Sequence, residues 1–330
     1  MDTFKPSEQA IDQASSVGGL KRRKHRDWSG VTVALILGLF GLFLGRLGAL
    51  WIRFDVFSQF SMQFLFLVAA AIIGLVMPRF MSLCAGVLFV MFIALYGLWP
   101  LLLTGGAEDP LAAGEKRLSV AQFNIHGVDA DARAVVAAIR GLNPDVMTLV
   151  EIDGRNRPIF DALKAQWPYQ TSCWSNASCD TAIISKYPLT ESRGQGEWAG
   201  PSYVMANLGA DFGNLTIVGV HTTRFPHARA QFAQVQELAK FLGQNRGKLL
   251  VMGDFNATPF SRVTQVLKKT LGLTLQTAMP SWPADRLLPQ IAIDHIFTSV
   301  GVRAISGERA GLSGGSDHLP ISMILAVSSP

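Results

Sequence analysis

The stretch LLVMGDFNATP, residues 249–259, is the most informative part of this sequence for the fold. Residues 249–253 form a short apolar run, which predicts a buried strand, and Asp254 and Asn256 follow at its end. Polar groups that follow apolar strands gather at one edge of a sheet, where ligands bind. A Gly-Asp pair standing alone is an ordinary turn, so the interpretation of this stretch depends on the segments around it.

The same pattern, a short apolar run that ends on polar side chains, recurs on both sides of this stretch. These runs mix with helical segments without strict alternation, which favours an α/β (α+β) fold with mixed β-sheets covered by helices. The polar residues at or just beyond the predicted strand ends are Asn124, Glu151, His221, Asp254, Asn256, Asp294, Asp317 and His318. They offer carboxylates, carboxamides and imidazoles, and such oxygen-dominated ligands suit Mg²⁺ or Mn²⁺ better than structural zinc.

Seven motifs stand in this region in order: AQFNI (121–125), NPDVMTLVEID (143–153), TAIISKYPL (181–189), VGVHTTR (218–224), LLVMGDFNATP (249–259), IDHIF (293–297) and GSDHLPI (315–321). On these motifs the chain from about 118 to 326 resembles the endonuclease/exonuclease/phosphatase superfamily, which includes pancreatic deoxyribonuclease and the neutral sphingomyelinases. The resemblance implies a four-layer sandwich, with two mixed β-sheets packed face to face and helices outside. It also implies a metal-dependent phosphodiesterase or phosphatase.

The resemblance assigns three residues to a metal site. Glu151 is implied as the principal Mg²⁺ ligand, Asn124 as its partner, and Asp317 as a further metal-linked carboxylate. Mg²⁺ needs only one or two protein carboxylates when water and substrate phosphate complete its shell. The chain departs from the superfamily at Val150, where glutamine often precedes the metal glutamate. We expect this change to be tolerated because the position is not a ligand.

The resemblance also assigns the catalytic groups. Asp254 and Asn256 are implied to position or deprotonate the attacking water and to contact the scissile phosphate. His318 is the implied catalytic histidine, oriented by Asp294, and His221 contacts the phosphate or protonates the leaving oxygen. A histidine ring held by a carboxylate keeps one tautomer and gains basicity, which suits acid–base chemistry. Whether Asp254 or His318 is the base stays open.

Further candidates lie near the second histidine. Asp180 stands where pancreatic deoxyribonuclease has a carboxylate paired with its second histidine, so we expect it to orient His221; a solvated loop aspartate is the alternative. Arg224 belongs to the densest basic group near the expected site and could bind substrate phosphate or form part of a solvated face. Cys173 and Cys179 are close enough in sequence for a disulfide in an oxidising compartment, and two reduced thiols fit the spacing equally well.

The first third of the chain is predicted to be a membrane anchor. Only 16% of all residues are charged and the mean hydropathy is +0.29, and long uncharged stretches lie between residues 28 and 107. Each is long enough to cross about 30 Å of hydrocarbon as a helix, so we predict transmembrane helices at about 29–50, 59–78 and 81–103. A cleaved signal peptide and a buried helical hairpin fit these stretches less well. The predicted parts are a basic tail (1–28), the anchor (29–103), a linker (104–117) and a catalytic domain (118–330).

The charges beside the spans predict the orientation. A basic cluster at residues 21–26 precedes the first span, and the positive-inside rule places such a cluster in the cytoplasm. An odd number of spans then puts the catalytic domain outside the cytoplasm, in the periplasm, as part of a multi-pass protein of the inner (plasma) membrane. Arg46 and Arg53 fall on the outer side and weakly oppose this orientation.

The anchor and the mild net charge of +5 indicate the substrate. A tether raises the effective concentration of a hydrolase for lipid-borne phosphates and does little for soluble nucleic acid, which needs a stronger basic surface. The layout is also similar, less closely, to bacterial VanJ-type membrane proteins, which are associated with lipid-carrier pyrophosphate. We therefore expect a Mg²⁺-dependent hydrolase whose partners are membrane lipids and a lipid-linked phosphate, pyrophosphate or phosphodiester. A membrane-tethered endonuclease/exonuclease acting on nucleic acid and an inactive binding or scaffold domain are the alternatives.

Overall fold

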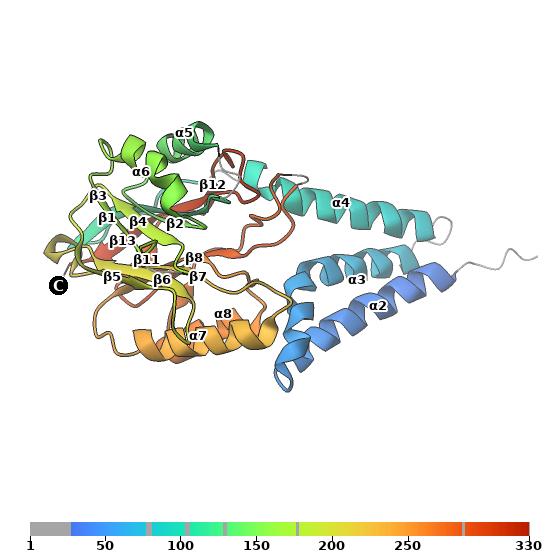
Figure 1. The fold of residues 1–330 in the computed structure, drawn as a ribbon. Coiled ribbons are helices and arrows are strands. Elements are labelled where there is room, and N and C mark those ends of the chain that lie inside the picture. The colour runs from blue at the N-terminus through green and yellow to red at the C-terminus, as the bar shows by residue number, and fades with distance from the viewer. Residues whose placement is uncertain are drawn as a thin grey trace, which may run out of the picture.

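The computed structural model describes residues 28–76, 81–102, 106–127, 131–175, 178–285 and 288–329. An α/β domain forms one end of the molecule, and three long helices project from one side of it (Figure 1). The predicted basic tail, apart from Trp28, lies outside the described residues.

The α/β domain contains two mixed β-sheets, as predicted. The first has, in spatial order, β11 (Val302–Ala304), β13 (Ile321–Ser328), β1 (Glu115–Asn124), β2 (Val146–Val150), β4 (Thr181–Ser185) and β3 (Tyr169–Ser172), and β12 (Arg309–Ala310) also pairs with β13. The second has β5 (Thr190–Gln195), β6 (Ser202–Asn207), β7 (Thr216–His221), β8 (Leu249–Asp254), β10 (Asp294–Thr298) and β9 (Thr274–Leu275). β1 and β2 pair in parallel, as do β7 and β8, so each sheet has a central strand pair that ends at one edge.

Helices cover the outer faces of the two sheets (Figure 1). The first sheet is covered by α5 (Ala132–Leu142) and by α6 (Arg157–Leu163), which follows the short 3-10 helix η2 (Gly154–Asn156). The second sheet is covered by α7 (Ala228–Leu242) and α8 (Arg262–Leu271). A further 3-10 turn, η3 (Ala210–Phe212), joins β6 to β7.

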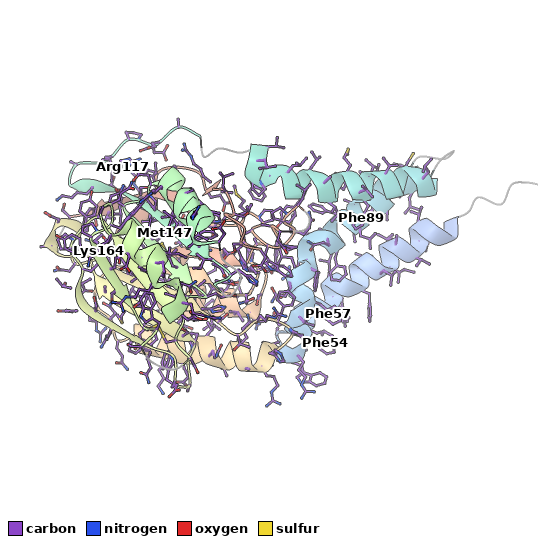
Figure 2. All side chains as sticks on the ribbon, turned by 45° about the horizontal axis from the view of Figure 1, so that its top comes forward. Phe54, Phe57, Phe89, Arg117, Met147 and Lys164 are labelled. Atoms are coloured by element: carbon purple, nitrogen blue, oxygen red, sulfur yellow. A yellow bond between two sulfur atoms is a disulfide. The ribbon has the colours of Figure 1, made fainter. Side chains whose placement is uncertain are left out.

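Alternate residues of the central strands enter different apolar layers, which explains the four-layer architecture. On β1, Leu118 and Val120 are buried between the two sheets, whereas Phe123 belongs to the core beneath α5 and α6. Met147 of β2, labelled in Figure 2, lies in that same outer core. On β8, Met252 likewise packs between the sheets, while Val251 packs beneath α7 and α8. Because successive side chains of a strand point to opposite faces, an apolar run without alternation predicts a strand buried on both faces. The predicted four-layer sandwich is confirmed.

The cysteines of the α/β domain are paired. Cys173 and Cys179 form a disulfide, with their Cα atoms 5.4 Å apart. The structure therefore has the bonded form of the two alternatives that the spacing allowed. Cys84, within the anchor, is a free thiol.

The anchor consists of α2 (Trp28–Leu47), α3 (Ser61–Val76) and α4 (Met81–Leu102), with the 3-10 helix η1 (Ile52–Phe60) between α2 and α3. Three segments here are long and apolar enough to cross a membrane: Gly30–Leu47, Ile52–Val76 and Leu83–Leu102. Large apolar side chains such as Phe40, Phe43 and Val90 are more than half exposed on the helix surfaces, which suits a lipid environment. The end of the anchor that carries η1 lies against the α/β domain (Figure 1).

Candidate active site

The central strands of both sheets deliver polar residues to one edge of the sandwich. Asn124, His221 and Asp254 are the last residues of β1, β7 and β8, and Glu151 follows β2 directly. Asp294 begins β10, which runs antiparallel to β8, so it comes to the same edge paired with Asp254. Because the two sheets pack face to face, strand ends that are far apart in sequence meet here.

His318 and Asp294 form a buried pair. His318 Nδ1 lies 2.8 Å from Asp294 Oδ2, and Gln122 Nε2 donates to the other carboxylate oxygen of Asp294. Burial alone would lower the pKa of His318, but the negative charges of Asp294 and Asp254 outweigh it and raise this pKa to about 10. His318 Nε2, left free of Asp294, faces Asp254 Oδ2 at 3.8 Å. The structure thus places Asp294 where the sequence predicted it, behind the ring of His318.

His221 and Asp180 form a second pair, as the sequence hypothesis expected. His221 Nδ1 lies 2.7 Å from Asp180 Oδ2. Burial works to lower the pKa of His221, but the charge of Asp180 and this hydrogen bond raise the pKa to about 9. The other ring nitrogen, Nε2, lies 3.9 Å from Glu151 Oε1 and 4.0 Å from Asp254 Oδ2. Asp180 is therefore a partly buried partner of the histidine and not a solvated loop aspartate.

Carboxylates converge beside these histidines in a way that fits a hard cation. Asn124 Nδ2 donates to Glu151 Oε1 at 2.8 Å and to Asp254 Oδ2 at 3.0 Å, so two like charges are held on one amide group. Burial and the neighbouring charge of Asp294 raise the pKa of Asp254 to about 6. Asp317 Oδ1 is 3.2 Å from His126 Nδ1, which in turn is 3.6 Å from Glu151 Oε2. Oxygen donors crowded in this way favour a divalent cation, which lowers their mutual repulsion.

Three residues of the site have backbones in the left-handed region. His126 has φ 49°, Glu151 has φ 58° and Asn256 has φ 47°, conformations that are uncommon for residues other than glycine and concentrate at functional sites. The turn at Asn256 is held by two hydrogen bonds: its N–H donates to Asp254 Oδ1 at 2.7 Å, and its Nδ2 donates to Thr222 O at 3.0 Å. Gly253 precedes this turn with φ 153°, and a Cβ there would lie 1.9 Å from Val220 O. The GDFN motif therefore needs its glycine for the close approach of β7 to β8.

Sequence reasoning missed several residues that the structure brings to the site. Gln122 precedes Asn124 by two positions and therefore points to the same face of β1, a period-2 signal that was available. His126 follows the same strand, and its place in the stretch AQFNIH was the only sequence signal. Trp282 Nε1 donates to Asp317 Oδ2 at 3.0 Å, and Ser316 Oγ donates to Asn124 O at 2.7 Å. These four residues orient the predicted ones.

Arg224 is the one predicted residue that the structure does not bring into the cluster of histidines and carboxylates. Its side chain is exposed on the loop after β7, and its carbonyl oxygen accepts from His227 N at 3.3 Å. Within the described residues its guanidinium makes no hydrogen bond or ion pair with the site, so a role in binding phosphate stays a prediction.

The family of the chain follows from comparison with known proteins. The endonuclease/exonuclease/phosphatase family profile matches residues 121–318, more than half of the chain, and the chain belongs to this family. Its members are hydrolases of phosphoester bonds. Exodeoxyribonuclease III of Haemophilus influenzae is 26% identical over 151 residues, which make up 42% of this chain and 57% of that relative. The chain thus spans little more than half of the length of this curated relative.

Solved structures share the fold at low sequence identity. An endonuclease/exonuclease/phosphatase from Beutenbergia cavernae has a TM-score of 0.52 and 16% identity, over 64% of this chain and 72% of the other. The mannosyl-6-phosphatase of Bacteroides thetaiotaomicron has a TM-score of 0.51 and 14% identity, over 64% of this chain and 99% of its own. These likenesses cover the α/β domain and support its fold.

Proposed function

We propose that this protein is a membrane-anchored, Mg²⁺-dependent phosphoester hydrolase that acts on a lipid-linked phosphate, pyrophosphate or phosphodiester. The main support for hydrolase activity is a cluster of side chains around Asn124, in a chain that belongs to a family of phosphoester hydrolases. The cluster consists of Glu151, Asp254, His221 and His318. All groups that the chemistry needs are present in one place.

The residues divide the chemistry among them. Glu151 and Asp317 would hold a divalent cation, Mg²⁺ or Mn²⁺, which when bound neutralises charge on the phosphate oxygens. Asp254, fixed by Asn124 and by the N–H of Asn256, orients the attacking water. His318, held by Asp294, presents Nε2 as a hydrogen-bond donor to the phosphate.

His221 serves the leaving oxygen. Asp180 binds its Nδ1, so its Nε2 points toward the carboxylates of Glu151 and Asp254, where the ester bond would break. A proton held at Nε2 can be given to the leaving oxygen, which avoids the release of an unstable alkoxide.

The three apolar helices support a lipid substrate. A tether keeps the hydrolase at the surface where lipid phosphates are concentrated. We place the N-terminal tail in the cytoplasm and the α/β domain in the periplasm, and the disulfide Cys173–Cys179 supports an oxidising compartment for this domain. A membrane-tethered nuclease is the second candidate, favoured by the similarity to exodeoxyribonuclease III.

The proposal is tested with the full chain in detergent. We expect Mg²⁺-dependent hydrolysis of bis-p-nitrophenyl phosphate, loss of this activity in EDTA and its recovery with Mg²⁺ or Mn²⁺. Glu151→Gln should raise the Mg²⁺ concentration for half-maximal rate by about 10- to 100-fold, because one charged ligand becomes neutral. Asp211→Asn, on the surface of η3, is the matched control. No activity with any divalent cation would indicate a binding or scaffold domain.

The substrate class is tested by comparing the rates at which three phosphate-containing substrates are hydrolysed. Phosphatidic acid and a polyprenyl pyrophosphate in mixed micelles are compared with plasmid DNA at equal phosphate concentration. We expect one of the lipids to be hydrolysed fastest. Faster cleavage of plasmid DNA would favour the tethered nuclease.

A further inference from the structure

The loops that carry the candidate active site rest on the anchor. Phe225, four residues beyond His221, contacts Phe60 of η1 with ring centroids 6.1 Å apart. Thr258, two residues beyond Asn256, donates its N–H to Gln59 Oε1 at 2.7 Å. The opposite edge of the sandwich, where β13 ends and the C-terminus lies, points away from the anchor (Figure 1). The edge of the domain with the active site is therefore the edge against the membrane helices.

A third loop reaches α3 and α4. The backbone oxygen of Gln290 accepts from Gln63 Nε2 at 2.7 Å, and Gln290 Nε2 donates to Ile93 O at 3.2 Å. The same loop begins at Trp282, whose indole holds Asp317 of the candidate metal site. A single loop thus links the membrane helices to a residue of the active site.

Asp55 of η1 fastens the domain to the anchor. Its carboxylate accepts from Ser261 Oγ at 2.6 Å and from Arg262 N at 2.9 Å, so it caps the N-terminus of α8. Only 1% of Asp55 is exposed. A helix N-terminus favours a negative charge, and a buried carboxylate that loses its donors is costly. Separation of η1 from the domain is therefore opposed.

Aromatic side chains mark the height of the membrane surface at this junction. Trp51 precedes η1 and is 54% exposed, and Tyr96 and Trp99 lie on the last turns of α4 with ring centroids 6.0 Å apart. Figure 2 shows Phe54 and Phe57 at this end of the anchor, and Phe89 farther from the domain. Tryptophan and tyrosine gather at membrane–water interfaces. The interface thus runs at the level of η1 and of the active-site loops.

Phe260 extends the same level into the α/β domain. It lies in the loop between Asn256 and α8, is 45% exposed, and shares with Tyr96 and Trp99 the lining of a cavity of about 210 Å³. An exposed aromatic residue at this height is suited to contact with lipid.

We infer that the open edge of the active site faces the lipid bilayer, and that η1, through Asp55 and Gln59, holds it in that orientation. The substrate is then a phosphate carried at the surface of the same membrane, close to its hydrocarbon. A nucleic-acid duplex would have to enter between the domain and the lipid, which the contacts of η1, α3 and α4 oppose. This substrate class rests on the proposed function, whereas the orientation does not.

The orientation is tested by fluorescence quenching in the full chain. In a Cys84→Ser background, a fluorophore is attached to Phe260→Cys or to Val300→Cys, and the protein is reconstituted into phosphatidylcholine vesicles that contain doxyl-labelled lipid. Val300, which is 92% exposed in the turn between β10 and β11, is the matched control at the opposite edge. We expect quenching at position 260 to exceed that at position 300 several-fold. Equal quenching at the two positions would overturn the inference.

The role of η1 is tested in the same vesicles by Asp55→Asn. The amide keeps the shape but places an N–H against Ser261 or Arg262, so the attachment loosens and quenching at position 260 should fall by half or more. Arg53→Ala, an exposed change in the same segment, should leave it unchanged. Unaltered quenching in Asp55→Asn would exclude Asp55 as a positioning residue. Since neither measurement uses turnover, an inactive protein would count against the proposed function and leave the orientation standing.

Discussion

Two histidine–aspartate pairs face the same site, and they differ in their exposure to water. In each pair the two residues come from different sheets: Asp294 belongs to the second sheet and His318 precedes β13 of the first, whereas His221 belongs to the second and Asp180 precedes β4 of the first. The side chains of His318 and Asp294 are 5% and 0% exposed, and those of His221 and Asp180 are 18% and 33% exposed. The same kind of pair is therefore shielded from water on one side of the site and partly exposed to water on the other.

Burial and the carboxylate partner therefore affect a histidine separately: the partner orients the ring, and burial controls its contact with water. The sealed ring keeps one fixed orientation, which suits a donor that stabilises charge, while the open ring can exchange its proton with water, which suits a group that serves the leaving oxygen. Substitutions in the two pairs should therefore lower kcat by different factors.

The largest expected difference is between the two histidines. We expect His318→Ala to lower kcat for bis-p-nitrophenyl phosphate by about 1000-fold and His221→Ala by about 100-fold. The loss is smaller for His221 because water can protonate the leaving oxygen in its place. Steady-state kinetics at saturating Mg²⁺ measures both. A larger loss in His221→Ala would reverse the roles assigned to the two pairs.

The next effect is that of the aspartates behind the rings. Asp294→Asn should lower kcat by about 100-fold and Asp180→Asn by about 10-fold, because water can partly replace the more exposed carboxylate. Neither KM nor the thermal midpoint should change much in Asp180→Asn. Full activity of Asp180→Asn would show that this carboxylate does not orient His221.

The last prediction concerns a further buried histidine, His295, whose expected effect is on stability and leaves turnover aside. Within the described residues, the ring of His295 hydrogen-bonds to no carboxylate: its Nε2 faces Ala257 O at 2.8 Å and its Nδ1 faces Thr277 Oγ1 at 3.1 Å. Burial lowers the pKa of His295 to about 4, the opposite direction to His318. In the unfolded chain the pKa of this histidine is about 6.5. Between pH 6.5 and 4 its ring therefore binds a proton in the unfolded chain and stays neutral in the folded chain.

The stability that neutral His295 contributes is therefore fully present above pH 6.5 and is lost as the pH falls toward 4. Its size is on the order of 3 kcal/mol. His295→Gln keeps a donor for Ala257 O and cannot titrate, so its thermal midpoint should fall less between pH 7 and pH 4.5 than that of the natural chain. Near-ultraviolet circular dichroism of the full chain in detergent follows this. Parallel pH profiles for both proteins would assign the acid sensitivity to other groups.

The site was predictable from sequence to the extent that its residues follow apolar strands. Asp254, Glu151 and His221 each stand directly at the end of such a run, where a local pattern exposes them. Gln122 was missed because it lies inside its strand, and only the face that it shares with Asn124 reveals it. Asp55 lies in a segment whose hydropathy resembles a membrane span, and its partner Ser261 is 206 positions away. No local sequence pattern can predict a contact between residues so far apart in the chain.

Local sequence patterns predicted the buried strands with covering helices and the apolar spans, because strand burial and hydropathy are properties of neighbouring residues. The family and its four-layer sandwich followed from the resemblance of the motifs. The motif resemblance already predicted which aspartate stands behind which histidine, but the distances depend on the tertiary structure, since each pair joins two sheets whose packing brings the side chains into hydrogen-bonding range. Only the tertiary structure decided which edge of the sandwich meets the anchor. That choice depends on buried hydrogen bonds of Asp55 and Gln59, whose energy exists only when both surfaces exclude water.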